Sequence, residues 1–198
     1  MQDIKRRSNK DRSESTRGAL IQAARSLFVS RSYAEIATPE LVAAAGMTRG
    51  ALYHHFADKQ ALFHAVVEVE SALVASEVEQ AAPIDFPPIE ALIAGGNAYL
   101  DAMGAPGRTR LLLLDAPAVL GRSEADAIDA RHAGRTLREG LEAAMVAGVL
   151  ERYPLTTLTA ALSAMFERAA MAIDAGEDAN AWRQTLARLV NSIVRPMC

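Results

Sequence analysis

Residues 38–64 read TPELVAAAGMTRGALYHHFADKQALFH, and this stretch decides the fold. The pattern predicts a short helix, a glycine turn and a second short helix, followed by an abrupt start into a third. Thr38 is a good N-cap, and Pro39 suits the first helical position because its missing N–H removes no hydrogen bond there. Gly46 stands where a helix ends in the left-handed conformation, which glycine adopts without strain. This arrangement is typical of a helix-turn-helix that reads DNA.

The second short helix has an outward face that suits a nucleic acid. Thr48 is a good N-cap, so this helix begins two residues after the glycine. Its inward face can be apolar. Its outward face carries the cation of Arg49, the aromatic hydroxyl of Tyr53 and the imidazole of His54, and it has no side chain at Gly50. A solvated helix would carry Glu and Lys here, whereas this set matches the groups of a major groove and its phosphates.

The third helix begins with a candidate phosphate site. Asp58 is expected to cap this helix, and Lys59 follows in its first turn. The positive end of the helix dipole and the lysine ammonium together favour an anion.

The run AGMTRGALYHHF at residues 45–56, followed by DKQALF at residues 58–63, resembles the DNA-binding domain of the TetR-type transcriptional regulators. The resemblance covers about residues 14–74, with the helix-turn-helix motif at 37–56, and it implies a ligand-binding and dimerisation domain at 75–198. It also implies a homodimer that binds a double-stranded DNA operator and responds to a small-molecule effector. The residues that it assigns to DNA binding are Thr38, Thr48, Arg49, Gly50, Tyr53, His54 and Lys59.

Charge is distributed unevenly along the chain, whose formal net charge is −3. Residues 1–60 contain ten Lys and Arg against six Asp and Glu, a balance of +4, and residues 61–198 contain eleven against eighteen, a balance of −7. A basic end on an acidic body steers that end toward a polyanion. Residues 1–12 are a candidate basic arm for the DNA backbone or minor groove, although a solvated tail explains them equally well.

The composition excludes several classes of protein. No run of 18 apolar residues could cross a membrane, and the polar N-terminus carries no apolar signal segment, so we expect a cytoplasmic protein. The single cysteine is the last residue, which excludes a cysteine-based metal site. His54, His55 and His64 have no metal-ligand spacing, and Asp129-x-x-His132 lacks the second pair that a di-iron site needs. No motif of a catalytic nucleophile or a P-loop indicates an enzyme, and no metal or cofactor is expected.

Apolar residues recur at helical spacing along the chain, and with abundant alanine they predict an all-α fold of about nine helices. Outside the motif, the expected helices cover about residues 13–30, 59–79, 89–103, 108–115, 123–147, 154–175 and 178–195. Pro117 is expected to end the helix at 108–115, and Ser123 to cap the next one. Gly95 and Gly96 should weaken their helix or let another group come close.

The resemblance places the effector pocket in the second half of the chain. The candidate lining residues are Tyr99, Met103, Leu112, Met145, Met165 and Phe166, with Trp182 as a further candidate. The set is apolar and methionine adapts to varied shapes, which favours a hydrophobic or weakly polar small molecule. Each of these residues also fits an ordinary core position.

The last two predicted helices carry apolar stripes that a monomer could bury or that two copies could pair in a two-fold interface. The resemblance favours the dimer, which would place two recognition helices about 34 Å apart in successive major grooves.

The sequence therefore predicts a homodimeric repressor that leaves a near-palindromic operator when a small apolar ligand binds. Two alternatives stay open. One is a DNA-binding activator or architectural protein with a ligand-insensitive body. The other is a helical enzyme or carrier with a vestigial helix-turn-helix.

Overall fold

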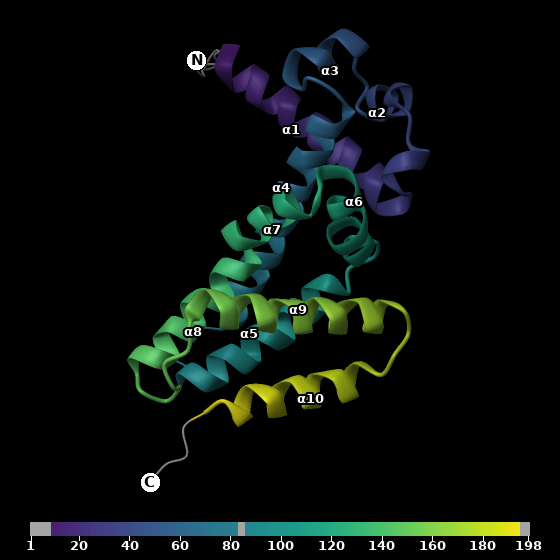
Figure 1. The fold of residues 1–198 in the computed structure, drawn as a ribbon. Coiled ribbons are helices and arrows are strands. Elements are labelled where there is room, and N and C mark those ends of the chain that lie inside the picture. The colour runs from purple at the N-terminus through teal and green to yellow at the C-terminus, as the bar shows by residue number, and fades with distance from the viewer. Residues whose placement is uncertain (1–8, 83–85, 195–198) are drawn as a thin grey trace, which may run out of the picture. The chain divides into compact units, whose positions relative to one another are not determined.

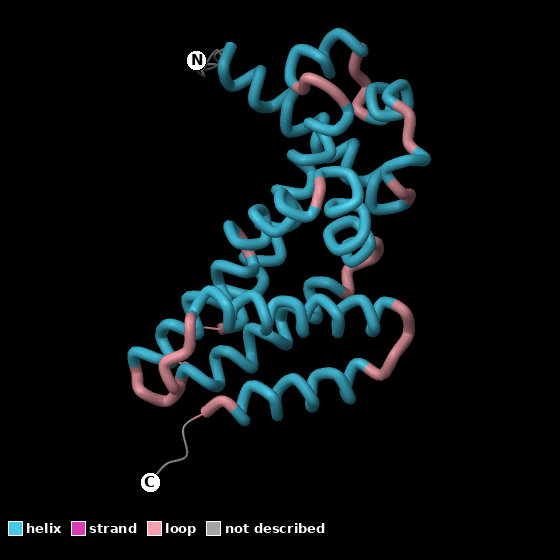
Figure 2. Tube along the Cα trace, viewed as in Figure 1, coloured by secondary structure: helices cyan, strands magenta, loops and turns pink. Residues whose placement is uncertain are grey.

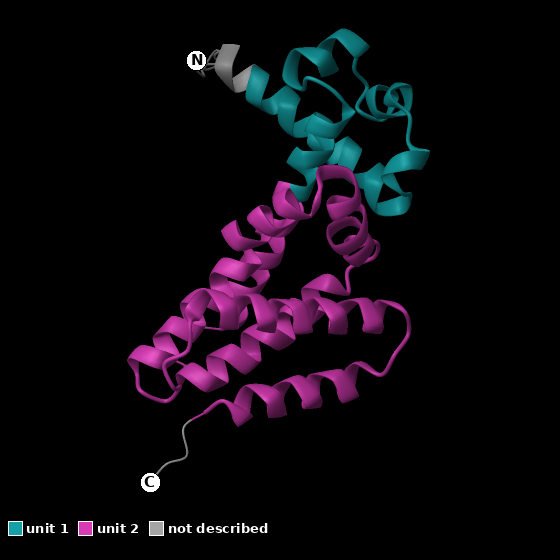
Figure 3. Cartoon of the chain, in the orientation of Figure 1, with its two compact units in different colours: residues 1–67 teal, residues 68–198 magenta. Residues whose placement is uncertain are grey.

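The computed structural model describes residues 9–82 and 86–194, with side chains described from residue 13 onward. Within these residues the regular structure is helical, apart from one antiparallel β-bridge between Leu150 and Val194, which confirms the all-α class (Figure 1, Figure 2). The chain divides into two compact units, residues 1–67 and 68–198, and the division falls inside helix α4 (Figure 3). The division predicted from the sequence lies later, between residues 74 and 75.

The first unit contains α1 (Asn9–Ser30), the 3-10 turn η1 (Tyr33–Glu35), α2 (Thr38–Ala44), α3 (Arg49–His55) and the start of α4 (Lys59–Ala81). The second unit contains the rest of α4, then α5 (Pro88–Met103), the π-helical turn η2 (Arg110–Asp115), α6 (Ala116–Leu120), α7 (Arg122–Arg131), α8 (Ala133–Val146), α9 (Leu155–Asp174) and α10 (Ala179–Ser192). None of the helices in these described residues has both the length and the apolar character needed to span a membrane.

Aromatic rings hold the helices of the first unit together. Phe28 of α1 meets Phe63 of α4 edge-on with ring centroids 5.1 Å apart, and Tyr33 lies 4.9 Å from the same Phe63 ring. Leu41 of α2 and Leu52 of α3 are fully buried. Helices as short as α2 and α3 are unstable in isolation, so this packing is what holds α3 in place.

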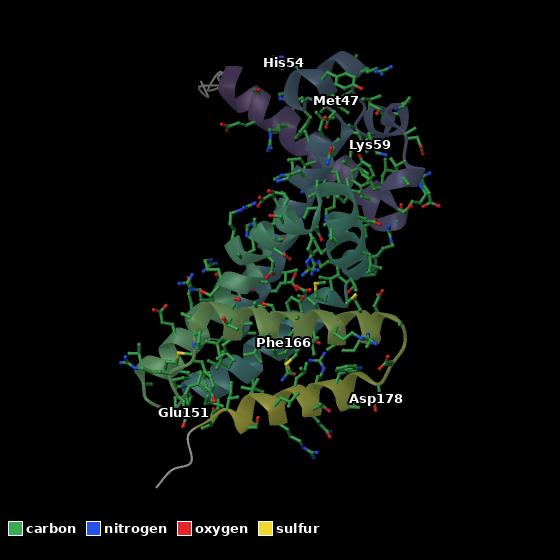
Figure 4. The ribbon with its side chains drawn as sticks, viewed as in Figure 1. Met47, His54, Lys59, Glu151, Phe166 and Asp178 are labelled. Carbon is green, nitrogen blue, oxygen red and sulfur yellow. The ribbon has the colours of Figure 1, made fainter. Side chains whose placement is uncertain are left out.

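The turn between α2 and α3 has the predicted geometry. Gly46 has a φ of +63°, which is the left-handed conformation that ends a helix without strain in glycine. The N–H groups of Gly46 and Met47 donate to the carbonyls of Ala43 and Val42 at 3.0 and 2.9 Å. These bonds close the C-terminal end of α2, and Met47 lies half-buried in the turn (Figure 4).

Two apolar clusters form the core of the second unit. Helix α5 packs against α8, α9 and α10 (Figure 1). One cluster joins Leu100 of α5 to Phe166 of α9, and the other joins Leu92 of α5 to Leu141 of α8 and Leu162 of α9. Helix α5 is therefore the central element of this unit.

The helix predicted for residues 123–147 is wrong, because the structure breaks it at His132 into α7 and α8. His132 leaves the helical conformation, with φ −121° and ψ −105°. The N–H of Gly134 donates to the carboxylate of Asp129, and a Cβ on residue 134 would lie 3.0 Å from the backbone oxygen of Asp129. The close approach of Gly134 to the end of α7 thus depends on the missing side chain. Helix α7 also begins at Arg122 and not after the predicted cap.

The prediction that Pro117 ends a helix is also wrong. Residues 110–115 form a π-helical turn that runs directly into α6, and Pro117 lies in the first turn of α6. Proline is tolerated there because the first N–H groups of a helix have no intrahelical partner. The N–H of Ala116 instead donates to the carbonyl of Leu111, five residues earlier.

Helix α1 begins at Asn9, ahead of the predicted start at residue 13. Residues 9–12 of the predicted basic arm are thus helical backbone, while residues 1–8 lie outside the described residues.

Candidate nucleic-acid interface and ligand cavity

Helix α3 presents its predicted DNA-binding side chains to solvent. The Oγ1 of Thr48 accepts a hydrogen bond from the N–H of Ala51 at 3.2 Å, so Thr48 is the N-cap that the sequence predicts. Arg49, Tyr53 and His54 are exposed (His54 is labelled in Figure 4). The helix therefore has one face fixed to the core and one polar face free for a partner.

Arg49 and Tyr53 form a pair on this outward face. The guanidinium carbon of Arg49 lies 5.4 Å from the centroid of the Tyr53 ring, and its Nη2 donates to the Tyr53 hydroxyl at 3.4 Å. Within the described residues no carboxylate pairs with Arg49. Its fork of donors is therefore available for guanine edges or phosphate oxygens.

Gly50 leaves open space on the same face. A Cβ built on Gly50 would meet only the Oγ1 of Thr48, at 3.8 Å. Glycine disfavours a helix by about 1 kcal/mol relative to alanine. Packing within the unit gives no reason for glycine here, whereas close approach of a DNA backbone does.

Lys59 has a contact inside the unit that the sequence did not predict. Asp58 caps α4 as expected, with its Oδ1 accepting from the N–H of Ala61 at 2.7 Å. The Lys59 ammonium donates to the carbonyl of Tyr33 and lies 3.9 Å from the centroid of the Tyr33 ring. Burial lowers the pKa of Lys59, and the nearby charge of Glu40 opposes that shift. The ammonium keeps further N–H donors that can meet a phosphate.

Thr38 is not the N-cap that the sequence predicts. Helix α2 begins at Thr38 itself, and Ala37 takes the cap position with extended backbone, φ −90° and ψ 151°. Glu40 replaces the missing cap, because its Oε1 accepts from the N–H of Ala37 at 3.0 Å and its Oε2 accepts from Arg31. Thr38 is half-buried, and its contact with DNA stays a prediction.

The second unit contains a cavity of about 880 Å³. Its apolar wall is supplied by Val78 of α4, Leu92 of α5, Leu137 of α8 and Phe166 of α9. A cavity of this size suits a drug-sized molecule. Gly96 lets the Phe166 ring approach α5 closely, because a Cβ on residue 96 would lie 2.5 Å from Cζ of Phe166 (labelled in Figure 4).

The cavity includes two of the residues predicted to bind the effector. Tyr99 and Phe166 line it, and their rings make an edge contact with centroids 6.2 Å apart. The other four predicted residues belong to the apolar clusters and not to the lining: Met103, Leu112, Met145 and Met165. A helical stripe specifies the buried face but not which buried residues border a void, so the contact of these four residues with an effector stays a prediction.

The polar groups of the lining are mainly acidic. Among the described residues that line the cavity, four are carboxylates and none is basic: Glu79, Asp129, Glu139 and Glu167. Burial raises the pKa of Asp129 to about 6, and the charge of Glu167 adds to that shift. Burial likewise raises the pKa of Glu167. Burial and the charges of Asp129 and Glu167 together raise the pKa of Tyr99, so its hydroxyl stays protonated.

Sequence reasoning missed these carboxylates because it paired Asp129 with His132. In the structure the Nε2 of His132 lies 2.7 Å from Oε2 of Glu68, whereas Asp129 borders the cavity. The described residues hold no cluster of three or more His, Cys, Asp or Glu suited to a metal. The signal that could have found the acidic group is Glu167, a charge beside Phe166 at the edge of an apolar stripe.

Two family models match the chain. The model described as bacterial regulatory proteins of the tetR family matches residues 20–66. The model described as a tetracyclin repressor-like C-terminal domain matches residues 89–197.

Curated relatives match part of the chain. The HTH-type transcriptional regulator AcrR of Shigella flexneri is 32% identical over 108 residues, which is 54% of this chain and 50% of that protein. The HTH-type transcriptional repressor AcnR of Corynebacterium efficiens is 33% identical over 70 residues, which is 35% of this chain and 37% of that protein. The match thus spans half the length of these relatives or less.

A solved structure extends the similarity to nearly the whole chain. A TetR-family transcriptional regulator from Pectobacterium atrosepticum matches with a TM-score of 0.76 and 31% identity, covering 96% of this chain and 100% of that one. These relatives are regulators and not enzymes. The chain therefore belongs to the TetR family of bacterial transcriptional regulators.

Proposed function

We propose that the protein is a homodimeric repressor that binds a near-palindromic operator through α3 and leaves it when a small molecule fills the cavity. The outward face of α3 is the observation that carries the DNA-binding part of this proposal. On it lie a capped helix N-terminus, an Arg49 that pairs with Tyr53 but with no carboxylate of the described residues, and an open Gly50. The relative AcnR, a transcriptional repressor by name, supports the sign of regulation.

The exposed sides of α9 and α10 support a dimer. The buried stripes of these helices, which include Leu162 and Leu186, are used within the chain, so a second copy would have to meet the opposite faces. The exposed residues there include small or apolar ones, Thr157, Ala160, Ala161, Ala164, Ala181, Thr185 and Leu189, and the polar Arg168, Gln184 and Arg188. Leu189 is 42% exposed. A self-complementary face of this kind fits an interface with two-fold symmetry.

A dimer supplies the geometry that an operator needs. Two copies of α3 must enter major grooves about one helical turn apart, roughly 34 Å, and a two-fold axis then requires a near-palindromic site. Ala161→Arg together with Leu189→Arg should convert the dimer to monomers in analytical ultracentrifugation. Ala130→Arg, on the exposed side of α7, is the matched control and should stay dimeric.

Helix α4 is the candidate link between ligand and DNA. Its first residue is Lys59, and its last two turns supply Val78 and Glu79 to the cavity lining. A ligand that moves α4 would change the spacing of the two α3 helices. The ligand must bind the DNA-incompetent state more tightly, since equal affinity for both states shifts nothing. A hundredfold loss of operator affinity needs about 2.7 kcal/mol of coupling.

The test is selection of bound duplexes from a random library at several salt concentrations. A near-palindromic motif with half-sites one turn apart is the expected result, and Arg49→Ala should abolish its enrichment. Arg138→Ala, an exposed arginine on α8, is the control and should leave enrichment unchanged. Weak binding that falls steeply with salt and selects no motif would contradict the proposal.

A further inference from the structure

Part of the acidic lining of the cavity is already neutralised by the protein. Arg135 pairs with Glu79 of α4 and with Glu139, four residues along its own helix, at 3.0 Å. All three side chains are 41% exposed or more. Glu79 and Glu139 therefore belong to a solvated ion-pair network, so they need no counter-charge from a ligand.

The second pair of carboxylates is short of positive charge. Among the described side chains, Glu167 has only Arg122 as an ion-pair partner, at 3.4 Å, and Arg122 is already bound to Asp126 at 2.7 Å. Asp129 accepts a hydrogen bond from the N–H of Gly134 but has no ion pair in the described residues. The Arg122 guanidinium thus pairs with two carboxylates, Asp126 and Glu167, and leaves Asp129 without an ion pair in the part of the chain that the structure describes. Asp129 and Glu167 both line the cavity. Buried carboxylates without a counter-charge are unfavourable.

Tyr99 adds an unused polar group at the same place. Its hydroxyl makes no hydrogen bond within the described part of the chain, although burial and the charges of Asp129 and Glu167 raise its pKa. Because the ring contacts Phe166 edge-on, an aromatic face and a hydroxyl both border the cavity. Tyr99 is half-buried and its hydroxyl is not shut off from the cavity, so this group can donate to or accept from a bound molecule.

We propose that the cavity takes an organic cation, with a protonated amine held between Asp129, Glu167 and Tyr99 and an apolar, ring-sized body against Leu92 and Phe166. This inference rests on the proposed function, because it names the class of its effector. The amine supplies the counter-charge that Asp129 lacks and that Glu167 shares with Asp126 through Arg122. Its N–H groups can donate to the carboxylates and the Tyr99 oxygen. The aromatic rings favour a cation further. An anion of the same shape meets only repulsion.

The experiment compares three molecules that share one ring system and differ in charge. They are 1-naphthylmethylammonium, 1-naphthylmethanol and 1-naphthylacetate, and binding to the full-length protein without DNA is measured by calorimetry at pH 7.5. The ammonium should bind at least tenfold more tightly than the alcohol, and the acetate should bind more weakly than both. Equal affinities, tighter binding of the acetate, or no binding by any of the three would overturn the proposal.

Variants identify the groups that select the charge. Asp129→Asn combined with Glu167→Gln should remove the preference for the ammonium while leaving the affinity for the alcohol within about twofold. Glu142 is an exposed acid on α8, and Glu142→Gln should change neither the preference for the ammonium nor the affinity for the alcohol. A preference for the ammonium that survives the double variant would show that other groups select the ligand and would overturn the assignment.

The same molecules separate this inference from the proposed function. Release of the selected operator is measured for each molecule by fluorescence anisotropy. Selective binding of the ammonium without release would support the cation site and contradict ligand control of DNA binding. Release by the alcohol but not by the ammonium would support ligand control and overturn the cation site.

Discussion

The Nε of Arg108 lies 3.1 Å from Oε2 of Glu70, and their side chains are only 7% and 0% exposed. The same guanidinium also donates to the carbonyl of Ala102 at 2.6 Å and to Oε1 of Glu77 at 3.1 Å. The ion pair therefore joins α4 to the segment that follows α5. Removing one partner of such a pair leaves an uncompensated buried charge.

Glu70→Ala should therefore lower the free energy of unfolding by about 3–5 kcal/mol. The double variant Glu70→Leu with Arg108→Met should recover most of this loss, because apolar groups of similar size leave no charge to compensate. Chemical denaturation followed by circular dichroism measures both. Asp126→Ala, which removes an exposed partner of Arg122, is the control and should change stability by no more than about 1 kcal/mol. A loss from Glu70→Ala as small as that of the control would contradict the role of the pair.

Gly96→Ala should destabilise the natural protein but stabilise a protein that carries Phe166→Leu. In the natural chain the new Cβ would lie 2.5 Å from Cζ of Phe166, and such overpacking costs about 1–3 kcal/mol. In a Phe166→Leu background that clash is absent, so the helix preference for alanine should stabilise the protein by up to about 1 kcal/mol. Thermal unfolding of the natural protein, the two single variants and the double variant gives a double-mutant cycle. Gly18→Ala on α1, where a Cβ meets nothing, should stabilise in both backgrounds. Stabilisation by Gly96→Ala in the natural chain would refute the close contact.

Lys59→Met should weaken binding to all duplex sequences alike. The substitution keeps the apolar stem that packs on the Tyr33 ring but removes the ammonium. If that ammonium binds a phosphate, the slope of log K against log salt should become shallower by about one unit. Fluorescence anisotropy on the selected operator and on a scrambled duplex tests this. A loss confined to the selected operator would mean that Lys59 contributes to base recognition.

The helix-turn-helix of the first unit could be predicted from the sequence. Its signals are local, since Gly46, Thr48 and Asp58 each specify a turn or a cap through their own backbone chemistry. The exception is Thr38, where the side chain of Glu40 does the capping from inside the helix. The position of a helix end is uncertain by one or two residues from propensity alone, so the cap at Ala37 could not be distinguished from one at Thr38.

The sequence predicts that the second unit is helical, but it does not predict which residues line the cavity. The break at His132 depends on the close contact between Gly134 and Asp129. The cavity depends on which helix faces do not pack against a neighbouring helix. The apolar period of a single helix separates buried from exposed positions only, so it predicts neither the break nor the cavity. Asp129 and Glu167 come together through tertiary packing, so the proximity of these two carboxylates could not be predicted from either helix alone.

Asp129→Asn should stabilise the ligand-free protein at high pH and not at low pH. The pKa of Asp129 is raised to about 6 by burial and by the charge of Glu167, whereas an unfolded aspartate titrates near about 3.9. The folded state therefore binds this proton more tightly, so the group's contribution to stability is fully present below about pH 4 and is lost as the pH rises through about 6. Asparagine cannot ionise and can still accept from the N–H of Gly134. The variant should gain at most about 3 kcal/mol over the natural protein at pH 8 and show little gain at pH 4. Thermal unfolding at both pH values checks this, with the exposed Asp174→Asn as control. A gain that is equal at the two pH values, or larger at pH 4, would show that burial does not disfavour the Asp129 carboxylate.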